Sequence, residues 1–390
     1  MSAPARGFLS HFLLLAVISG STLGMAKIVT TLYALEIGAN SVQIGLISAM
    51  ESLGMVFLTL PAGFLIARFG SRRIYLLASL GPALFNLAIL LSPGWLWLAA
   101  MRLLIGTCVP FRVVAMNTLF LQQLPHIGLN KAGWFRGSVM IGLGLLGPWL
   151  GSVLYGQAGF AGAFVVIALC FTGMAFYGAG FWQEAPAAPS RSSLGQQLRD
   201  MFSQRSLTES CLIECASSAT MSVFATFALV LCIEVLGWPD YQAVALVSAQ
   251  GLVSVLALFG LGSVISHLGH QRVYPGALLL VLVALGLLGW ADSFPGLLLA
   301  ALLLSLAGSA IHLANVTRLS HLLPDKSRIS GLFNLAQTLG MLLGALLGGS
   351  ISYLVGLHWL FPVWGLLLLT GVGLLRLKAA CRVVATAEEA

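Results

Sequence analysis

One polar turn occurs twice in this chain, and the repeat limits the folds that the sequence can adopt. The first copy, GFLIARFGSRRIY, covers residues 63–75, and the second, GSVISHLGHQRVY, covers residues 262–274. The same offset also matches Glu51 with Gln250. Self-similarity at a fixed distance indicates that two halves of the chain share one structural plan.

Long apolar segments flank each turn, and the composition indicates that they lie in a membrane. Of the 390 residues, 59% are hydrophobic and 8% are charged, which leaves too few polar side chains to cover a protein in water. Only helices or closed barrels satisfy their backbone groups in lipid. The continuous Leu, Ala, Gly and Val runs exclude a barrel, whose strands alternate in hydropathy over about 10 residues. We therefore expect an all-α integral membrane protein.

The apolar segments predict twelve transmembrane helices, because a helix needs about 20 apolar residues to cross the bilayer. They are expected at residues 10–35, 42–67, 74–92, 95–118, 135–157, 160–182, 208–234, 242–266, 273–291, 295–317, 329–354 and 358–377. The repeat divides them into an N-terminal six-helix bundle at 1–182 and a C-terminal six-helix bundle at 208–390. Residues 183–207 are polar and are expected to form a cytoplasmic linker with a short surface helix.

Lysine and arginine residues fall in alternate loops, and this pattern predicts the orientation of the chain. They follow the even-numbered predicted helices, as at Arg72, Lys131 and Arg272, whereas the opposite loops contain none. Basic loops remain on the cytoplasmic side. Both termini are therefore expected in the cytoplasm, with the chain in a bacterial-type inner membrane. The first helix is expected to be retained, because no small-residue cleavage site follows it.

No sequence pattern indicates an enzyme, a metal site, a cofactor site or a nucleic-acid-binding surface. The chain has no phosphate-binding Gly-x-x-x-x-Gly-Lys-[Ser/Thr] loop, no Ser/His/Asp set and no metal-ligand spacing. The formal net charge of +7 comes from basic residues scattered singly through turns. The six cysteines lie mostly in apolar segments and are expected to be reduced. Any work that this chain does on a solute must therefore use an ion gradient or a partner.

The first turn resembles the loop between helices 2 and 3 of the major facilitator superfamily, which usually reads G-x-L-x-D-R-x-G-R-R/K. The matching residues that the resemblance implies as a gating loop are Gly63, Arg68, Gly70, Arg72 and Arg73. The loop departs from the pattern at Ala67, where the family usually has an Asp that is thought to hold the loop against neighbouring helix ends. The resemblance covers nearly the whole chain.

Two shorter patterns are similar to others in the family. Arg102 and Gly106 resemble an Arg and a Gly of helix 4, and Gly147, Pro148 and Gly151 resemble a G-P-x-x-G pattern of helix 5 that is associated with exporters. The resemblance implies two six-helix bundles that rock about a central site. Glycine stripes in the predicted helices 5 and 11 fit close helix contacts, either as static packing or as a sliding seam.

Five ionisable residues lie inside predicted helices, where a charge costs at least about 2.5–3.5 kcal/mol at the bilayer centre. They are Lys27, Glu51, Arg102, Arg112 and Glu214. By helix rise, the first three share one layer, and Arg112 and Glu214 lie in the inner half. One interpretation is structural: Glu51 pairs with Lys27 or Arg102, and Glu214 pairs with Arg112.

The other interpretation gives the same residues transport roles. Glu51 and Glu214 are the candidate proton carriers, because a helix movement that changes burial or a nearby cation would change their protonation. Polar stripes at helical spacing add residues that would line a wet interior. The candidate substrate-binding residues are Lys27, Arg102, Arg112, Met55, Met221, His312, Asn334 and Gln337. For His312, a hydrogen-bonded core histidine is the alternative.

Three intramembrane cations against two acids favour an anionic cargo, since Arg offers a fork that matches a carboxylate and Lys offers a point charge. We expect a monomeric, proton-coupled permease that moves a small anionic or zwitterionic organic solute, such as a siderophore-type chelate, by alternating access. A proton-driven efflux pump for drugs or amphiphiles is the alternative indicated by Gly147, Pro148 and Gly151. A non-transporting membrane receptor or scaffold is the alternative of another class, because the loop has Ala67 instead of Asp.

Overall fold

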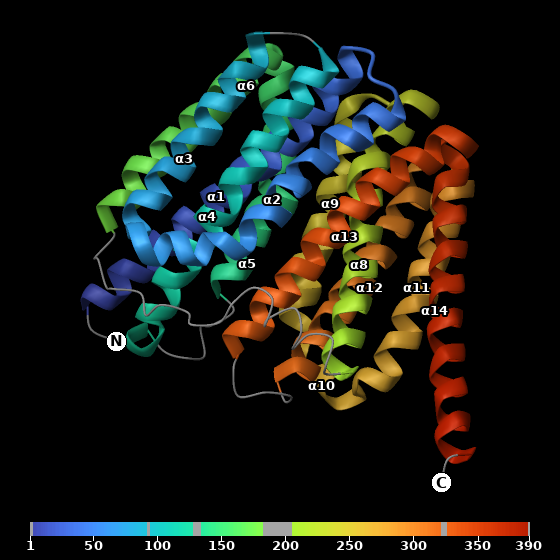
Figure 1. Cartoon of the computed structure of the whole chain (residues 1–390). Helices are drawn as coiled ribbons and strands as arrows, with labels where there is room; N and C mark the ends of the chain where they lie inside the picture. Colours follow the sequence, from blue (N-terminus) through green and yellow to red (C-terminus); the bar gives the residue numbers. More distant parts are fainter. Residues whose placement is uncertain (1–2, 92–93, 128–133, 182–204, 321–325, 389–390) are drawn as a thin grey trace.

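The chain is helical at nearly every position that the computed structural model describes, which are residues 3–91, 94–127, 134–181, 205–320 and 326–388 (Figure 1). Long apolar runs without strand-like alternation explain this, because a helix satisfies its own backbone hydrogen bonds. The elements are α1 (Ala3–Glu36), α2 (Ser41–Phe69), α3 (Ser71–Ala88), η1 (Ile89–Leu91), α4 (Trp95–Ile127), α5 (Trp134–Ile141), η3 (Gly142–Leu146), α6 (Gly147–Phe181), α8 (Arg205–Val230), η4 (Leu231–Val235), α9 (Asp240–Gly260), α10 (Gly262–Leu268), α11 (His270–Trp290), α12 (Phe294–Ser320), α13 (Lys326–Val355) and α14 (Leu357–Glu388). The surface helix predicted in the linker lies outside the described residues.

Within the described residues, ten helical stretches are long and apolar enough to cross a membrane. One of them, Trp134–Gly178, contains the π-helical segment η3 and is interrupted at Gly159, where φ is 66°. This interruption lies between the two helices predicted at 135–157 and 160–182. A shorter apolar stretch, Leu357–Val372, opens α14. Figure 1 shows α1 beginning and α14 ending on the same lower side of the molecule.

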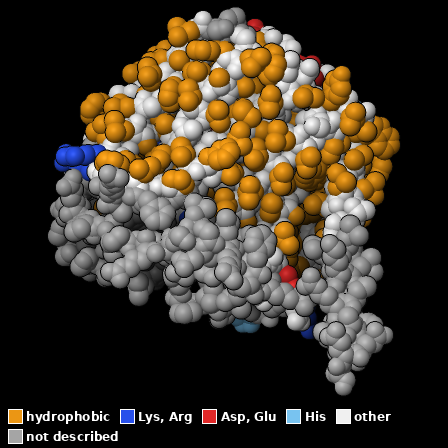
Figure 2. Space-filling view, in the orientation of Figure 1, with side chains coloured by type: hydrophobic (Ala, Val, Ile, Leu, Met, Phe, Trp, Pro, Cys, Tyr) orange, Lys and Arg blue, Asp and Glu red, His pale blue; other side chains and the backbone are white. Residues whose placement is uncertain are grey.

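The outer surface is apolar over most of its height. Figure 2 shows hydrophobic side chains across the middle of the visible face and charged side chains near its edges. Phe57, Leu84, Phe176 and Leu279 are each more than 60% exposed. An apolar surface of this extent would be unfavourable in water and is suited to lipid.

Buried apolar residues form two main clusters that follow the order of the chain. The larger cluster lies in the N-terminal half (α1–α6) and receives Val230 from α8. The other lies in the C-terminal half (α8–α14) and receives Ile28 and Leu32 from α1. The two halves therefore have separate cores and exchange a few side chains where α1 approaches α8.

Glycines bring the two halves into contact along two seams. In the first seam α2 packs against α13, and a Cβ added to Gly45 would lie 3.0 Å from the Cα of Gly349. In the second seam α9 packs against α5 and η3, and a Cβ added to Gly251 would overlap the backbone of Gly144. Only hydrogen fits at such positions, so these glycines set the distance between the halves.

The repeated turn has the same backbone conformation in both copies. Gly70 follows α2 with φ of 85°, and Gly269 follows α10 with φ of 72°. The amide of each donates to a carbonyl four residues earlier, Gly70 to Ile66 at 2.9 Å and Gly269 to Ile265 at 3.0 Å. A positive φ strains any residue with a Cβ, which explains why both copies have glycine here. The structure thus agrees with the equivalence that the sequence repeat indicates.

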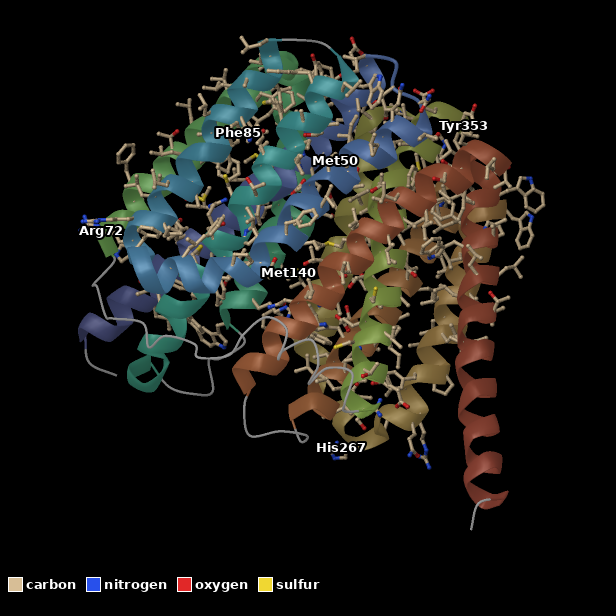
Figure 3. The ribbon with its side chains drawn as sticks, in the orientation of Figure 1. Met50, Arg72, Phe85, Met140, His267 and Tyr353 are labelled. Atoms are coloured by element: carbon tan, nitrogen blue, oxygen red, sulfur yellow. The ribbon has the colours of Figure 1, made fainter. Side chains whose placement is uncertain are left out.

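The basic residues of the first turn are only partly described. Arg72 and Arg73 are exposed, and Figure 3 shows the Arg72 side chain extending away from the helices. The side chains of Arg68 and Ala67, and the surroundings of Gly63, lie outside the described residues. The expected gating role of this loop therefore stays a prediction.

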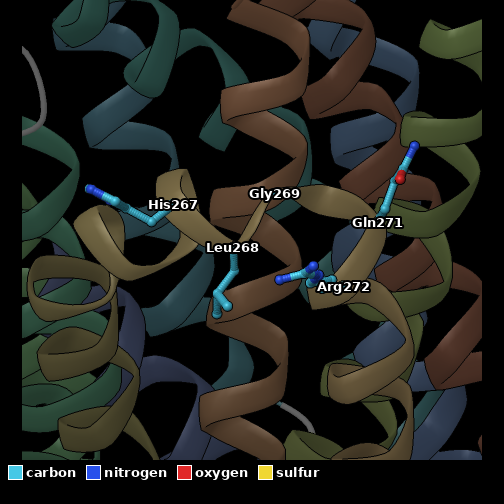
Figure 4. A pocket seen from close by; sticks show the side chains of 5 residues that line it. All are labelled: His267, Leu268, Gly269, Gln271 and Arg272. Atoms are coloured by element: carbon cyan, nitrogen blue, oxygen red, sulfur yellow. The ribbon is translucent and has the colours of Figure 1, made fainter.

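The second turn lines a shallow hollow of about 380 Å³ formed by His267, Leu268, Gly269, Gln271 and Arg272. Figure 4 shows that the His267 and Gln271 side chains point away from each other and do not converge on a common space. A binding site needs polar groups that converge on one ligand. This hollow therefore does not qualify as the candidate site.

Candidate functional site

Two charged residues of the N-terminal half neutralise each other. The Arg102 guanidinium on α4 donates through Nη2 to Oε2 of Glu51 on α2, and both residues are at most 5% exposed. The helices approach closely here because Gly54 faces the Leu103 carbonyl and Gly106 faces the backbone of Glu51. Of the two pairings expected for Glu51, the pairing with Arg102 is confirmed.

Arg112 is the second buried cation of α4, and it lies away from the acids. Its Nε donates to Ser79 Oγ at 3.1 Å, and its Nη2 donates to Ser19 Oγ at 3.1 Å. The guanidinium carbon also lies 4.7 Å from the centroid of the Phe171 ring. These partners come from α1, α3 and α6, so Arg112 faces the interior of its own half. The expected pairing of Arg112 with Glu214 is therefore wrong.

Glu214 on α8 is instead held by three residues of the C-terminal half. Gln337 Nε2 on α13 donates to Oε1 at 2.6 Å, and Asn315 Nδ2 on α12 donates to Oε2 at 2.7 Å. His312 Nδ1 lies 2.7 Å from Oε1. An ionised carboxylate accepts hydrogen bonds only, so three nitrogen donors suit the ionised form and require His312 to carry its proton on Nδ1.

We call Glu214 and its three partners, His312, Asn315 and Gln337, the Glu214 cluster. Further contacts hold these partners in place. Tyr274 on α11 donates its hydroxyl to Asn315 Oδ1 at 2.7 Å, which leaves the amide NH2 of Asn315 directed at the carboxylate. The His312 ring lies 5.5 Å from the Phe333 ring, measured between centroids. Oriented donors of this kind hold a carboxylate in one position.

Lys27 differs from the other intramembrane charges because it is exposed. Among the described residues it has neither an ion pair nor a side-chain hydrogen bond. On the same side of α1, Gly20, Gly24, Thr30 and Ala34 are buried, whereas Leu23 and Thr31 are half-buried. Lys27 is therefore an exposed charge on a mostly buried helix face.

The other predicted substrate-binding residues are half-buried. Met55, Met221 and Asn334 lie on α2, α8 and α13. Within the described part of the chain, none of the three joins the Glu214 cluster by a side-chain hydrogen bond. The structure thus brings His312 and Gln337 to Glu214, brings Arg102 to Glu51, and leaves Lys27, Arg112 and these three residues in separate surroundings.

The sequence-based prediction missed two residues of this region. Asn315 is one helical turn beyond His312, so the predicted polar stripe on that helix needed only one further step to include it. Arg136, which lies in a basic loop that the sequence places on the cytoplasmic side, is within electrostatic range of Glu214. No local pattern indicates this long-range relationship, because it joins two halves of the fold.

The described side chains offer no alternative chemistry based on a metal. Among them, no group of three or more His, Cys, Asp or Glu residues could hold a metal ion. The five described cysteines, including Cys211 and Cys215 near Glu214, form no disulfide bond. The ion-pair and hydrogen-bond arrangements around Glu51 and Glu214 remain the features that a function must explain.

Comparison with known protein families identifies the class. A sequence model described as Major Facilitator Superfamily matches residues 12–270 and 211–388, which together span nearly the whole chain. The chain belongs to the major facilitator superfamily. It is a multi-pass membrane protein of a family that transports small solutes, and it is not an enzyme. No curated protein matches the sequence.

Solved structures of transporters share the fold. The nucleoside transporter NupG superposes with a TM-score of 0.77 at 12% identity, covering 91% of this chain and 95% of that chain. A bacterial homolog of the human lysosomal transporter Spinster, inward-facing and unoccupied, gives 0.77 at 15% identity, with coverage of 90% and 84%. The human organic anion transporter MFSD10 gives 0.65 at 20% identity, with coverage of 95% and 99%. At these identities the similarity concerns the fold.

Proposed function

We propose that this chain is a monomeric twelve-helix secondary transporter that moves a small anionic or zwitterionic organic solute by alternating access. Its N-terminal bundle comprises residues 1–182, its cytoplasmic linker residues 183–207 and its C-terminal bundle residues 208–390. It lies in a bacterial-type inner membrane with both termini in the cytoplasm. The solute binds between the bundles, where Lys27 supplies a positive charge.

The observation that carries this proposal is the surroundings of Lys27. A free ammonium group on a mostly buried helix face is retained against its cost only if it meets water or an oppositely charged cargo. A cationic cargo would be repelled by it. An anionic or zwitterionic solute would replace the lost hydration with an ion pair.

The distribution of charge between the halves supports the same cargo class. Residues 1–182 contain nine Lys and Arg residues and two acids, Glu36 and Glu51. Since Glu51 is already paired with Arg102, the cations Lys27 and Arg112 have no acid of their own half in the membrane region. A positive potential of this kind attracts anions toward the space between the bundles.

The Glu214 cluster is the proposed proton-coupling site. Its partners are uncharged amides and one histidine, so the carboxylate can accept a proton without breaking an ion pair with Lys or Arg inside its own half. A proton on the Glu214 carboxylate would face one of the three nitrogen donors and make that contact repulsive. The side chains that meet at this position would then change. Glu51 is the second candidate, although its pair with Arg102 makes it a weaker proton acceptor.

Vesicle transport tests the proposal directly. Labelled citrate, a ferric hydroxamate chelate, a zwitterionic amino acid and a cationic dye are supplied to right-side-out and inverted vesicles, with and without a pH gradient. We expect accumulation of an anionic or zwitterionic compound that depends on the gradient. K27Q should raise KM for that compound, and E214Q should remove the gradient dependence while retaining exchange. Movement of only the cationic dye would overturn the proposal.

Export of amphiphiles is a second candidate function, and the G-P-x-x-G segment at the start of α6 favours it. Gly147 and Pro148 lie against Gly24 of α1, and Gly151 lies against Met25. This is the G-P-x-x-G segment that resembles the exporter pattern. In the same vesicles, export would appear as uptake into inverted vesicles only, driven by a gradient that is acidic inside.

A further inference from the structure

The carboxylate of Glu214 determines what the His312 ring presents on its opposite edge. His312 Nδ1 lies 2.7 Å from Oε1 of Glu214. A carboxylate only accepts hydrogen bonds, so the neutral ring must carry its proton on Nδ1 and present Nε2 as a lone pair. Glu214 therefore makes Nε2 a hydrogen-bond acceptor.

Nε2 of His312 is the part of the cluster that water can reach. It has no hydrogen-bond partner among the described residues, and it is not one of their fully buried unpaired atoms. The His312 side chain is 14% exposed, whereas that of Glu214 is 4% exposed. Gly308, one turn earlier on α12, faces the Met221 side chain of α8, so this face of α12 is directed at other helices and not at lipid. A proton that arrives from water therefore reaches the imidazole more readily than the carboxylate.

The carboxylate of Glu214 is already occupied at both oxygens. Oε1 accepts from Gln337 and His312, and Oε2 accepts from Asn315. Asn315 is held in this orientation, because its own Oδ1 accepts from the Tyr274 hydroxyl at 2.7 Å. A proton on the carboxyl group would compete with these donors, whereas a proton on Nε2 displaces none. An imidazolium would also form a charge-assisted hydrogen bond with Glu214.

We propose that the coupling proton binds to Nε2 of His312 and that Glu214 is the positioning residue that prepares this nitrogen to accept it. The proton adds to the Nε2 lone pair, so the ring becomes an imidazolium with N–H groups at both nitrogens. The His312–Glu214 pair thereby changes from one negative charge to neutral. This inference rests on the proposed function, and it assigns the proton to the imidazole of the Glu214 cluster instead of its carboxylate.

Protonation reverses what the accessible edge of His312 offers to a cargo. Neutral Nε2 repels a carboxylate, because both present lone pairs and Glu214 adds a negative charge. The Nε2–H group of the imidazolium donates a charge-assisted hydrogen bond to the same carboxylate. Proton and anion therefore favour each other's binding, and this coupling is reciprocal. Both must then cross the membrane in the same direction.

Other ionisable groups around the ring do not supply this dependence on pH. They are Cys211 and Cys215 on α8, Tyr274 on α11, Arg318 on α12 and Arg136 on α5. Cysteine and tyrosine ordinarily titrate above pH 8, and arginine keeps its charge. Arg318 is paired with Glu209 at 2.9 Å. Arg136 adds a like charge at long range, whereas Glu214 adds the opposite charge at contact distance. Histidine ordinarily titrates between pH 5 and pH 8.

Solid-state NMR of the histidine-labelled protein in lipid bilayers shows which ring nitrogen carries a proton, and it needs no cargo. The His312 signals are assigned by their absence from H312N, whose side-chain amide can still donate to Glu214. At pH 8.5 we expect a proton on Nδ1 only. As pH falls toward 4.5, Nε2 should gain a proton while Nδ1 keeps its own. A neutral ring with its proton on Nε2, or a ring that stays neutral over this range, would overturn the proposal.

E214Q tests the positioning role of the carboxylate. Glutamine can still accept from Nδ1 but supplies no negative charge, so the pH at which half of the His312 rings are protonated should fall by about one to three units. D292N removes an exposed acid between α11 and α12 and should leave that pH unchanged. Equal midpoints for the parent and E214Q would refute the role of Glu214. If E214Q aggregates, the tautomer of the parent protein still decides.

The vesicle assay separates this inference from the proposed function. H312N should lose gradient-driven accumulation of the anionic or zwitterionic compound and keep its exchange. Gradient-driven accumulation by H312N equal to that of the parent would refute the role of His312 and leave transport established. If no compound moved in the parent vesicles while the Nδ1 tautomer and its titration were observed, the proposed function would fail and the proton-binding role of His312 would stand.

Discussion

Arg102 and Glu51 form a buried ion pair between α4 and α2, and the two helices approach closely enough for it because Gly106 lies against the Glu51 backbone. Arg102 and Gly106 are one turn apart, so both face α2. The Arg and the Gly of this short pattern therefore act on the same neighbour: one carries the charge and the other allows the approach. The arrangement explains why neither charge is expelled from the apolar interior.

Breaking this pair on one side should destabilise the protein strongly. E51Q leaves the Arg102 guanidinium buried without its counter-charge, and R102M leaves the Glu51 carboxylate alone, so each is expected to cost about 3–5 kcal/mol. E51L/R102M removes both charges and should recover most of the loss. Thermal unfolding in detergent measures all three, with R72M as an exposed control that should change little. If the double variant lost as much stability as the two single variants combined, loss of the ion pair would not explain their destabilisation.

Gly106 should tolerate no side chain. A Cβ at this position overlaps the Glu51 carbonyl oxygen, so G106A must push α2 away from α4 and is expected to cost about 1–3 kcal/mol. Gly173 on α6 is a matched control, because an added Cβ there meets nothing within 4 Å. G173A should be neutral or slightly stabilising, since alanine favours the helix. Equal melting temperatures for the two variants would contradict this account.

The sequence predicts the positions of the helices better than the partners of their side chains. Both results follow from the same signal, which is the length of each apolar segment. Apolar length determines where a helix crosses the membrane, and α2, α11 and α12 lie within three residues of their predicted ranges. Apolar length says nothing about rotation around the helix axis, because nearly every face of these helices is apolar. Depth along the axis placed Arg112 and Glu214 in the same layer, yet Arg112 faces Ser19 and Ser79 within its own half.

Contacts across the two halves were the least predictable part of the candidate site. The neighbours of Glu214 on α12 follow the stripe through Ser305, Ser309 and His312, so Asn315 was within reach of helical spacing. Arg136 was not, because its electrostatic relationship with Glu214 depends on how α5 is placed against the C-terminal half. Local spacing therefore describes one helix face, whereas the site is completed by packing between distant segments.

Arg112 should respond to substitution differently from Arg102. Among the described residues no carboxylate contacts it, so R112M removes a buried and unpaired charge and is expected to leave thermal stability unchanged or raise it. R112K keeps the charge but loses the fork that bonds Ser79 and Ser19 and stacks on Phe171, and it should cost about 1–3 kcal/mol. Detergent unfolding compares both with R102M. If R112M lost as much stability as R102M, an acidic partner would have to exist.

Asn315 should be the position where a small change makes stability depend on pH. N315D places a second carboxyl group 2.7 Å from Glu214 Oε2, and two carboxylates at that distance cannot both ionise. The native variant therefore holds a proton that the unfolded chain releases above about pH 4. Its stability relative to the parent should fall as pH rises, by at most about 1.4 kcal/mol per unit. Unfolding at pH 5 and pH 8 tests this, and N315L, which adds no titrating group, should show no such slope.

The opposite end of the molecule contains a cavity of about 170 Å³ that is lined from both halves, by Glu36 and Tyr155 on one side and by Glu234 and Asp240 on the other. The Tyr155 hydroxyl hydrogen-bonds Asp240, while Glu36 and Asp240 interact as like charges. The hydrogen bond holds the halves together and the repulsion opposes it. E36Q removes only the repulsion, so it should raise the melting temperature at pH 7.5, by about 1–2 °C.

The gain from E36Q must depend on pH in a defined direction. The repulsion exists only while both carboxyl groups are ionised, so the gain is present above their titration range and disappears as pH falls toward 4. Y155F should act oppositely at pH 7.5, because it removes the attraction and keeps the repulsion. D292N removes another exposed acid outside the cavity and serves as the control. Gains that were equal at pH 7.5 and pH 4, or equal for E36Q and D292N, would show that repulsion across this cavity does not oppose its closure.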